Sequence, residues 1–238
     1  MKKLFIIIPA YNEEKYIRDC LISLQKQDVQ PERFEVVVVN NASTDTTKLI
    51  IQEFGFNVID ETKKGYVNAL HTGYKHALDN GADWLATTNA DSRVPLNWVR
   101  KILEDAEKDG IVGVTGPLVF WDAFPGANLF VKGGYSLLIA ITRLFGGFPQ
   151  FSGPNMAFSV DAYHEIGGID VAFNMSPDVE LSRQLSKIGE IYYDKRLVVK
   201  VSSRRFKEQP LTAMKTYAKG LFAVLRGKSN NIEWDDVR

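Results

Sequence analysis

The sequence predicts an α/β fold with an open, mostly parallel β-sheet flanked by helices. Runs such as LFIIIP (residues 4–9) and EVVVVN (residues 35–40) are rich in apolar, β-branched residues. Polar and apolar residues do not alternate in them, as is typical of strands that are buried on both faces of a parallel sheet. Each run is followed by a segment with helical periodicity. Short βα units of this kind form open sheets with right-handed crossovers.

The first half of the chain is expected to alternate between strands and helices. Asn12 can cap a helix that extends to about Gln27, and Ser43 can cap a second helix with Asp45 in its first turn. The apolar face of the first helix comprises Ile17, Cys20, Leu21 and Leu24. Further strands are expected at 57–60, 83–89 and 111–117, and further helices at 67–78 and 94–110.

The second half is less regular, because residues 121–152 carry aromatics and glycines without a clean period. A strand is expected at 154–160, a helix at 177–189, and two strands meeting at a turn near Lys195. The last element is an amphipathic, basic helix near the C-terminus, whose apolar stripe comprises Leu211, Met214, Tyr217, Leu221, Phe222 and Leu225.

Composition places the chain among globular proteins, since 45% of its 238 residues are hydrophobic and 24% are charged. The net charge is zero, but residues 195–230 hold ten bases against one acid, Glu208. Such a surface attracts phosphates or an anionic membrane, or it is a solvated face. The single cysteine, Cys20, excludes an internal disulfide, and the cytoplasm is the expected compartment. No apolar run reaches the roughly 18 residues of a membrane span, and the run after MKK is expected to be a buried strand.

Several common motifs are absent. There is no G-x-G-x-x-G, and RGKS at 226–229 fails as a phosphate-binding loop because Phe222 stands where that pattern needs glycine. The histidines do not cluster, no Ser-His-Asp arrangement is evident, and no nucleic-acid module is present. We therefore expect no nucleic-acid partner.

Three polar segments follow three of the predicted strands: PAYNEE, NNASTD and TNADS. In open α/β sheets, ligands bind at the carboxyl ends of the strands. The three segments are expected to converge at that edge.

Seven segments, taken in chain order, carry a family resemblance. They are IIIPAYNEEKYIRDCLISL, VVVVNNASTDTT, KKGYVNALHTGYKHA, TTNADSRVPLNWV, GPNMAFSVDAYHEIGGID, SPDVELSRQL and VSSRRF. Together they resemble the family 2 glycosyltransferases of the GT-A fold over roughly residues 3–206. The resemblance implies transfer of a sugar from a nucleotide diphosphate sugar, with inversion at the anomeric carbon. It also implies a divalent metal, Mg²⁺ or Mn²⁺, bound at the segment that resembles the D-x-D motif.

The resemblance places the metal at Asp91, with Asn89 in the position of the first acid. A hard cation held by carboxylate oxygen can neutralise the charge that develops on a leaving diphosphate. Asn89 would instead hydrogen-bond a ribose hydroxyl. The alternative for Asp91 is a helix cap, although Ser92 could cap instead.

The resemblance places the catalytic base at Asp178, and Glu180 is the next candidate. Inversion needs a base that takes the proton of the acceptor hydroxyl. Pro177 stands where the family usually has an acid, and proline favours a helix start, so the local geometry can be kept. The alternative for Asp178 is an acid that complements the helix dipole.

The remaining candidates are expected to bind the nucleotide sugar. Lys64 would approach the diphosphate, Asn68 would line the pocket, and Glu13 would contact the ribose. Arg204 and Arg205 would pair with phosphate oxygens, unless they belong to a solvated basic strand end. The other residues expected at this edge are Pro9, Tyr11, Asn40, Asn41, Ser43 and Ala90. Asn40 and Asn41 stand where the family often has an acid, and uridine is favoured only by its frequency in the family.

The resemblance also organises the chain. Residues 1–209 would form the glycosyltransferase domain, with a Rossmann-like nucleotide-sugar half at 1–117 and an acceptor and base half at 118–209. Residues 210–238 would form the basic helix and an acidic tail, which would either rest on the inner face of a membrane or pack on the core. The acceptor would be a glycan or a lipid-linked molecule. The alternative function is a nucleotide-sugar-binding protein whose transfer activity is weak or lost.

Overall fold

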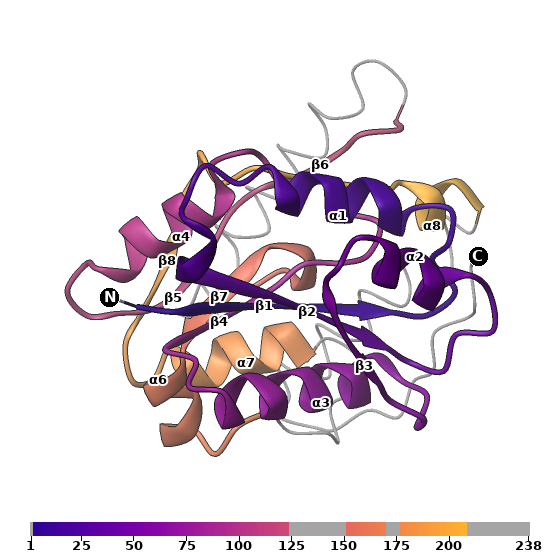
Figure 1. Ribbon diagram of the computed structural model, residues 1–238. Helices are drawn as coiled ribbons and strands as arrows, with labels where there is room; N and C mark the ends of the chain where they lie inside the picture. The colour runs from indigo at the N-terminus through magenta and orange to yellow at the C-terminus, as the bar shows by residue number, and fades with distance from the viewer. Residues whose placement is uncertain (1, 124–150, 170–176, 209–238) are drawn as a thin grey trace.

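The chain folds into a mostly parallel sheet covered by helices on both faces (Figure 1). The computed structural model describes residues 2–123, 151–169 and 177–208. The strands are β1 (Leu4–Ala10), β2 (Phe34–Asn40), β3 (Asn57–Asp60), β4 (Trp84–Thr87), β5 (Ile111–Thr115), β6 (Leu118–Phe120), β7 (Met156–Ser159), β8 (Glu190–Tyr193) and β9 (Val199–Val201). The α-helices are α1 (Ile17–Gln25), α2 (Thr47–Glu53), α3 (Tyr66–Asp79), α4 (Trp98–Ala106), α6 (Val160–Glu165), α7 (Pro177–Leu185) and α8 (Arg204–Glu208). The predicted fold class is confirmed.

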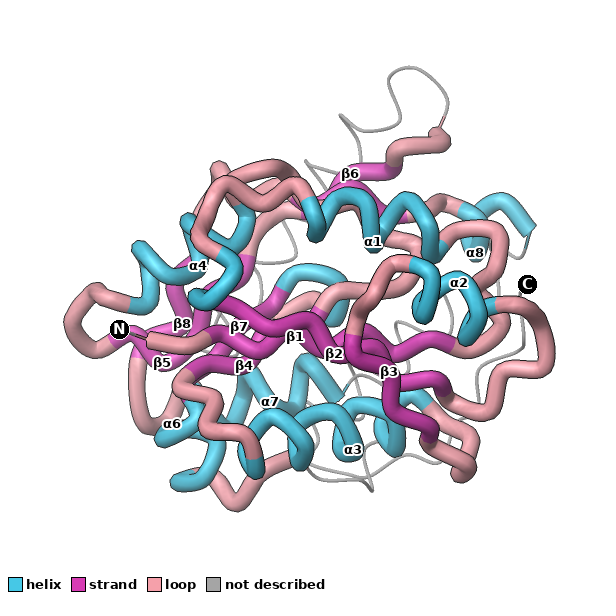
Figure 2. Tube along the Cα trace, viewed as in Figure 1, coloured by secondary structure: helices cyan, strands magenta, loops and turns pink. Residues whose placement is uncertain are grey.

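One seven-stranded sheet runs through the molecule in the order β3-β2-β1-β4-β7-β5-β8 (Figure 2). Strand β7 pairs antiparallel with both β4 and β5, whereas the other neighbours in this sheet are parallel. A second, two-stranded sheet consists of β6 and β9. Because β7 lies between β4 and β5, the main sheet is continuous across the boundary expected at residue 117.

The residues of β1 explain why the sheet has helices on both faces. Leu4, Ile6 and Ile8 pack in one apolar cluster with residues of α1 and α4, while Phe5 and Ile7 pack in a second cluster with residues of α3, α6 and α7. All five side chains are fully buried. Successive residues of a strand point to opposite faces, so an uninterrupted apolar run requires cover on both sides. This confirms that the run after MKK is a strand.

The helix caps predicted from Asn12 and Ser43 are wrong. Asn12 has a positive φ of 52°, and its Oδ1 accepts a hydrogen bond from the Thr44 amide at 2.8 Å. Ser43 Oγ accepts from the Asn12 amide at 3.1 Å. The amide of Thr47, at the start of α2, donates instead to Asp45 Oδ1 at 3.0 Å. The two loops lie side by side, so their polar side chains bond across the gap instead of capping their own helices.

Other boundaries differ by a few residues. The helix expected at 94–110 is α4, which spans only Trp98–Ala106, and Asn97 stands at its N-cap position without a side-chain capping hydrogen bond. The two strands expected around Lys195 are β8 and β9, but they pair in different sheets, with β5 and β6 respectively. The basic helix and acidic tail expected at 210–238 and most of the irregular stretch at 121–152 lie outside the described residues.

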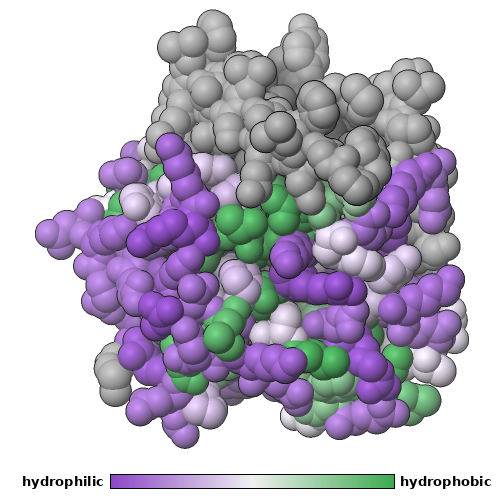
Figure 3. Space-filling view, turned by 90° about the horizontal axis from the view of Figure 1, so that it is seen from above, coloured by the Kyte–Doolittle hydropathy of each residue, from purple (hydrophilic) through white to green (hydrophobic). Residues whose placement is uncertain are grey.

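The face seen from the side of α1 and α4 is largely hydrophilic and carries scattered apolar areas (Figure 3). Leu49 and Leu96 are large apolar side chains that are exposed on the described part of the chain. Single exposed apolar residues are ordinary and imply no docking site. Among residues 2–123, 151–169 and 177–208, no helix has both the length and the apolar character of a membrane span.

Candidate active site

The carboxyl ends of β1, β2 and β4 meet at one edge of the sheet, as the sequence predicts. Parallel pairing sets Ala10 of β1 opposite Asn40 of β2, and Ile7 of β1 opposite Thr87 of β4. The amide of Asn41 donates to the Ala10 carbonyl at 2.8 Å, which continues the pairing beyond β2. The three polar loops therefore start from neighbouring positions, where open α/β sheets bind their ligands.

The loop after β4 presents two oxygen-bearing side chains. Asn89 Oδ1 is buried and has no hydrogen-bond partner among the described residues. Asp91 is two residues further on, and Ala90 between them is buried. Trp121 Nε1 donates to the Asp91 carbonyl at 3.3 Å and so ties the loop to the chain after β6. Asp91 does not cap α4, because that helix begins seven residues later.

These side chains fit a hard divalent cation. A carboxylate and an amide carbonyl are the oxygen ligands that Mg²⁺ and Mn²⁺ prefer. The unpartnered oxygen of Asn89 is available for such a contact. No group of three or more His, Cys, Asp or Glu side chains in the described ranges could hold a metal alone. A cation here would need further oxygens from a bound diphosphate, a common arrangement for Mg²⁺.

Arg204, the first residue of α8, joins Asp91 to the first loop. Its Nη1 and Nη2 donate to Glu13 Oε2 and Oε1 at 2.9 and 2.6 Å, and Nη2 lies 3.2 Å from Asp91 Oδ2. The guanidinium carbon also lies 4.7 Å from the centre of the Tyr16 ring. Arg204 and Glu13 are 8% and 6% exposed. Burial by itself lowers the pKa of Arg204, but the hydrogen bonds to Glu13 and the nearby Asp91 charge outweigh it and raise that pKa.

Glu13 and Arg204 were both predicted to bind the nucleotide sugar, but in the structure they pair with each other. Glu13 was expected at the ribose, yet both of its carboxylate oxygens accept from Arg204. Arg204 was expected at the diphosphate, yet it is engaged with two carboxylates. Their contacts with a nucleotide stay predictions. The side chain of Arg205 lies outside what the structure describes.

Tyr11, Lys64 and Asn68 are brought together beside the carboxyl ends of β1 and β3. Lys64 Nζ donates to Tyr11 Oη at 2.8 Å and lies 4.7 Å from the centre of the Tyr11 ring. Asn68 Nδ2 donates to the Lys64 carbonyl at 2.8 Å, which closes the turn before α3. Pro9 is half-buried in β1, just before this group. An aromatic face beside an ammonium group suits a base and a phosphate.

Asn40 and Asn41 fix the neighbouring loop through their amide groups. Asn41 Nδ2 donates to the Lys63 carbonyl at 2.8 Å, and its Oδ1 accepts from the Gly65 amide at 2.8 Å. Asn40 Nδ2 donates to Asp60 Oδ1 at 2.8 Å. The hydrogen bonds that Asp60 accepts lower its pKa, with the bond from Asn40 as the largest cause. An amide suits these positions because it donates and accepts at once.

Asp60 was missed by sequence reasoning, although a signal was present. It is the last residue of β3 and so lies at the same carboxyl edge as the three predicted loops. The sheet edge therefore carries an acid on β3, next to Asn40 of β2. The resemblance had led us to expect that acid at Asn40 or Asn41 instead. The strand-end rule that located the other loops would have located it too.

Asp178 is the second residue of α7 and is held by backbone amides. Oδ2 accepts from the Gly153 amide at 2.9 Å, and Oδ1 accepts from the Val179 amide at 3.1 Å. Burial raises the pKa of Asp178, although these two hydrogen bonds lower it in part. A raised pKa makes a carboxylate a stronger base, which suits proton abstraction from a hydroxyl. Each oxygen keeps a lone pair for such a proton.

Gly153, which sequence reasoning also missed, permits this arrangement. A Cβ at Gly153 would lie 2.6 Å from Tyr66 Oη and 3.8 Å from Asp178 Oδ2. A side chain at Gly153 would therefore require the tyrosine or the turn to shift. The available signal was the glycine of GPNMAFS, within a segment already assigned to the acceptor side.

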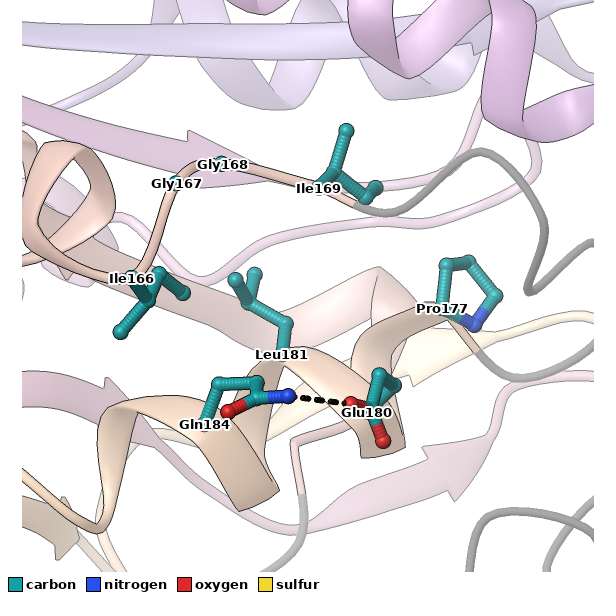
Figure 4. A pocket seen from close by; sticks show the side chains of 8 residues that line it. All are labelled: Ile166, Gly167, Gly168, Ile169, Pro177, Glu180, Leu181 and Gln184. Carbon is teal, nitrogen blue, oxygen red and sulfur yellow. Dashed lines mark hydrogen bonds between the residues drawn. The ribbon is translucent and has the colours of Figure 1, made fainter. Parts of the chain in front are cut away.

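Glu180, the second candidate base, is more fully engaged. It accepts from Arg183 Nε at 2.8 Å and from Gln184 Nε2 at 2.7 Å, and it is 5% exposed. It borders a hollow of about 370 Å³ beside α7, where Figure 4 shows its bond to Gln184. The hollow is lined by Ile166, Gly167, Gly168, Ile169, Pro177, Glu180, Leu181 and Gln184. Both oxygens of Glu180 already accept from side chains, whereas those of Asp178 accept from backbone amides, and this geometry favours Asp178.

The open sheet and its polar carboxyl edge define the chain as an α/β protein of the GT-A class. The sequence model of the family described as "Glycosyl transferase family 2" matches residues 5–167 of the chain. That match covers more than half of the sequence, so the chain belongs to glycosyl transferase family 2.

Several known proteins are similar to parts of the chain. A UDP-N-acetylglucosamine–dolichyl-phosphate N-acetylglucosaminyltransferase of Methanococcus voltae is 28% identical over 166 residues, 62% of this chain and 64% of that protein. The poly(ribitol-phosphate) β-N-acetylglucosaminyltransferase TarS of Staphylococcus aureus (strain Mu50) is 50% identical over 54 residues, 23% of this chain and 9% of its own length. The chain thus spans less than two thirds of these relatives.

A solved structure shares the fold. The mannosyltransferase PcManGT from Pyrobaculum calidifontis, in complex with GDP-Man and Mn²⁺, superposes with a TM-score of 0.75 at 20% identity. The superposition covers 94% of this chain and 63% of the other. At this identity the likeness establishes the fold alone.

Proposed function

We propose that the chain transfers a sugar from a nucleotide diphosphate sugar to a hydroxyl acceptor, with inversion at the anomeric carbon. One observation carries the proposal. The chain holds a carboxylate of raised pKa, Asp178, that is anchored by backbone amides, and it also has a loop after β4 whose side-chain oxygens suit a divalent cation. Family membership supports the reaction class.

In the proposed reaction, Asp178 removes the proton of the acceptor hydroxyl as that oxygen attacks the anomeric carbon. The bond to the nucleoside diphosphate breaks on the opposite face, and the diphosphate leaves with the bonding electrons. A divalent cation, Mg²⁺ or Mn²⁺, supplies Lewis-acid stabilisation of that charge when bound. Asp91 would hold it, with the unpartnered Oδ1 of Asn89 as a second ligand in place of the ribose contact expected from the sequence. Lys64 would add a positive charge near the phosphates.

The donor is proposed to be a UDP-sugar. The relative from Methanococcus voltae is named for a UDP-sugar, whereas the neighbour from Pyrobaculum is bound to GDP-Man. Thermal-shift screening of UDP- and GDP-sugars, with and without Mn²⁺, tests base and metal together, because a ligand that binds the native state stabilises it. A UDP-sugar should give the largest Mn²⁺-dependent rise in Tm. A larger rise with a GDP-sugar would overturn the choice of base.

The acceptor is proposed to be a glycan or a lipid-linked precursor, met at the inner face of a membrane by an otherwise cytoplasmic protein. The dolichyl phosphate acceptor in the name of the Methanococcus relative supports a lipid-linked molecule. The basic residues in 210–238 motivate the membrane contact. Flotation with anionic liposomes, with and without residues 210–238, tests it, and equal recovery would remove the contact.

A transfer assay with the wild type and Asp178→Asn tests the reaction itself. The variant should lose at least about 100-fold in kcat, the lower end of a general base's usual contribution. NMR of the product should give the anomeric configuration opposite to that of the donor. Retention of configuration, or full activity of the variant, would contradict the mechanism.

The alternative function is a nucleotide-sugar-binding protein with weak or lost transfer activity. Asn89 in the place of an acid and Pro177 before Asp178 motivate it. If nucleotide sugars bind tightly but none is consumed with any acceptor, this alternative is correct.

A further inference from the structure

The loop between β3 and α3, residues 61–65, carries Lys64, whose positive charge is proposed to lie near the phosphates of the donor. The side chain of Lys64 is exposed, and its Nζ donates to Tyr11 Oη at 2.8 Å. An ammonium group has three N–H donors, so it can also donate to a bound phosphate. The place of this ammonium group depends on how the loop is held.

The side chain of Asn41 holds this loop with all of its polar groups. Its Nδ2 donates to the Glu61 carbonyl at 3.2 Å and to the Lys63 carbonyl at 2.8 Å, and its Oδ1 accepts from the Gly65 amide at 2.8 Å. A side-chain amide has two N–H donors and a carbonyl acceptor, so one residue satisfies three backbone groups. These three backbone groups lie on both sides of Lys64 in the chain, and Asn41 itself is 5% exposed.

These contacts require an amide, and not an acid, at position 41. A carboxylate has no N–H to donate, and it would set a negative charge against the carbonyl oxygens of Glu61 and Lys63. The family often has an acid at the position of Asn40 or Asn41. The hold on the loop gives a physical reason for the amide at the second of these positions.

Gly65 lets the loop turn back toward Asn41. Its φ is 133°, which residues with a side chain rarely adopt. An added Cβ would also lie 3.0 Å from Asn68 Nδ2, which donates to the Lys64 carbonyl at 2.8 Å. The backbone around Lys64 is thus fixed by two side-chain amides, those of Asn41 and Asn68.

We propose that Asn41 is a positioning residue that holds Lys64 where it binds the diphosphate of the donor. The inference rests on the proposed function, in which Lys64 lies near the phosphates. It assigns to Asn41 a role that needs no contact with the base, the ribose or the sugar. Loss of the Asn41 amide should release the loop and cost the affinity that Lys64 contributes.

The experiment is a double-mutant cycle on nucleotide binding by the full chain. Isothermal titration calorimetry, at a fixed excess of Mn²⁺, measures the Kd of UDP or GDP, whichever binds the wild type more tightly. A hydrogen bond to a charged group corresponds to roughly 10- to 100-fold in affinity, so Lys64→Met should raise the Kd at least about tenfold. Asn41→Ala should raise it by roughly tenfold as well. In the Lys64→Met background, Asn41→Ala should raise the Kd by less than about threefold, because both changes remove the same contact.

Gly65→Ala is a second variant, which serves if Asn41→Ala does not fold. It displaces the same loop from an exposed position, because alanine does not readily adopt the φ of Gly65. Its effect on the Kd should also largely disappear in the Lys64→Met background.

Gln27→Ala is the matched control. Gln27 Nε2 donates to the Ser23 and Pro95 carbonyls, each at 2.9 Å, and Gln27 Oε1 accepts from the Val99 amide at 2.9 Å. These are the same three kinds of hydrogen bond, made elsewhere in the fold. Whatever the effect of Gln27→Ala on the Kd, it should have the same size in the wild-type and Lys64→Met backgrounds.

The outcomes separate the inference from the proposed function. A loss of affinity with Asn41→Ala or Gly65→Ala that largely disappears in the Lys64→Met background supports the inference. An equal loss in both backgrounds overturns it, since Asn41 would then act on the nucleotide by another route. Unchanged binding by Asn41→Ala also overturns it. If Lys64→Met binds as the wild type does, the role of Lys64 at the diphosphate fails and the inference falls with it. If the wild type binds neither UDP nor GDP, the proposed function fails first.

Discussion

Gly153→Ala is expected to impair the proposed base without removing any functional group. The Gly153 amide donates to Asp178 Oδ2 at 2.9 Å, and an added Cβ would lie 2.6 Å from Tyr66 Oη. Real Cβ atoms essentially never approach a heavy atom that closely, so the tyrosine or the turn must move. Because the amide and the added Cβ belong to the same residue, a shift of the turn lengthens or breaks the hydrogen bond to Asp178.

The size of the effect follows from the contacts that are lost. A hydrogen bond to a charged group contributes about 1.5–3 kcal/mol, and a displacement of about 1 Å can cost about 100-fold in rate. We therefore expect kcat/KM to fall roughly 10- to 100-fold. The amide of Gly153 lowers the pKa of Asp178, so its loss should raise that pKa further. A base works only when deprotonated, so the acid limb of the kcat/KM profile should move to higher pH.

The assay is the pH profile of sugar transfer by wild type and variant, with Tm measured in parallel. Gly189→Ala is the matched control, because a Cβ there would lie 2.3 Å from Val112 Cγ1, beyond the end of α7 opposite to Asp178. The control should lower Tm and leave the acid limb in place. A folded Gly153→Ala protein with the kcat/KM and acid limb of the wild type would refute the reasoning.

Further predictions concern the nucleotide edge. Asp91→Asn should abolish metal-dependent turnover, whereas Asn89→Asp should be tolerated or tighten Mn²⁺ binding; full activity of Asp91→Asn would disprove the metal role. Asn41→Asp removes the donor that bonds to the Lys63 carbonyl, so urea unfolding should show a loss of about 1–3 kcal/mol. Gly116→Ala would place a Cβ 2.3 Å from the Leu197 carbonyl oxygen, so the Tm should fall. An unchanged Tm would contradict this close approach of the two backbone segments.

The location of the polar loops could be predicted because it depends on local pattern. Uninterrupted apolar runs identify β1 and β2, and parallel strands place their carboxyl ends together. The roles of Asp91 and Asp178 came from the family resemblance of the ordered segments and stay predictions. The predicted helix caps were wrong because a sequence pattern shows which residue could cap a helix but not which other groups compete for its side chain. Asn12 and Ser43 form hydrogen bonds with each other's loops.

The partners of charged residues could not be predicted from sequence. Glu13 was assigned to a ribose and Arg204 to a diphosphate, since each was judged from its own segment. The distance of 191 positions between them carries no local signal. Similarly, nothing in the sequence around Asp178 indicates that Gly153 will approach it from a separate turn.

The sequence by itself determined the fold class, the order of the first strands and helices, and the residues at the carboxyl edge. Those features follow from periodicity and strand direction, which neighbouring residues encode. Only the tertiary structure decided that β7 enters the sheet antiparallel between β4 and β5, and that Arg204 faces Glu13 and Asp91 together. Such contacts depend on how distant segments pack, because hydrogen bonding and charge pairing act through space and not along the chain.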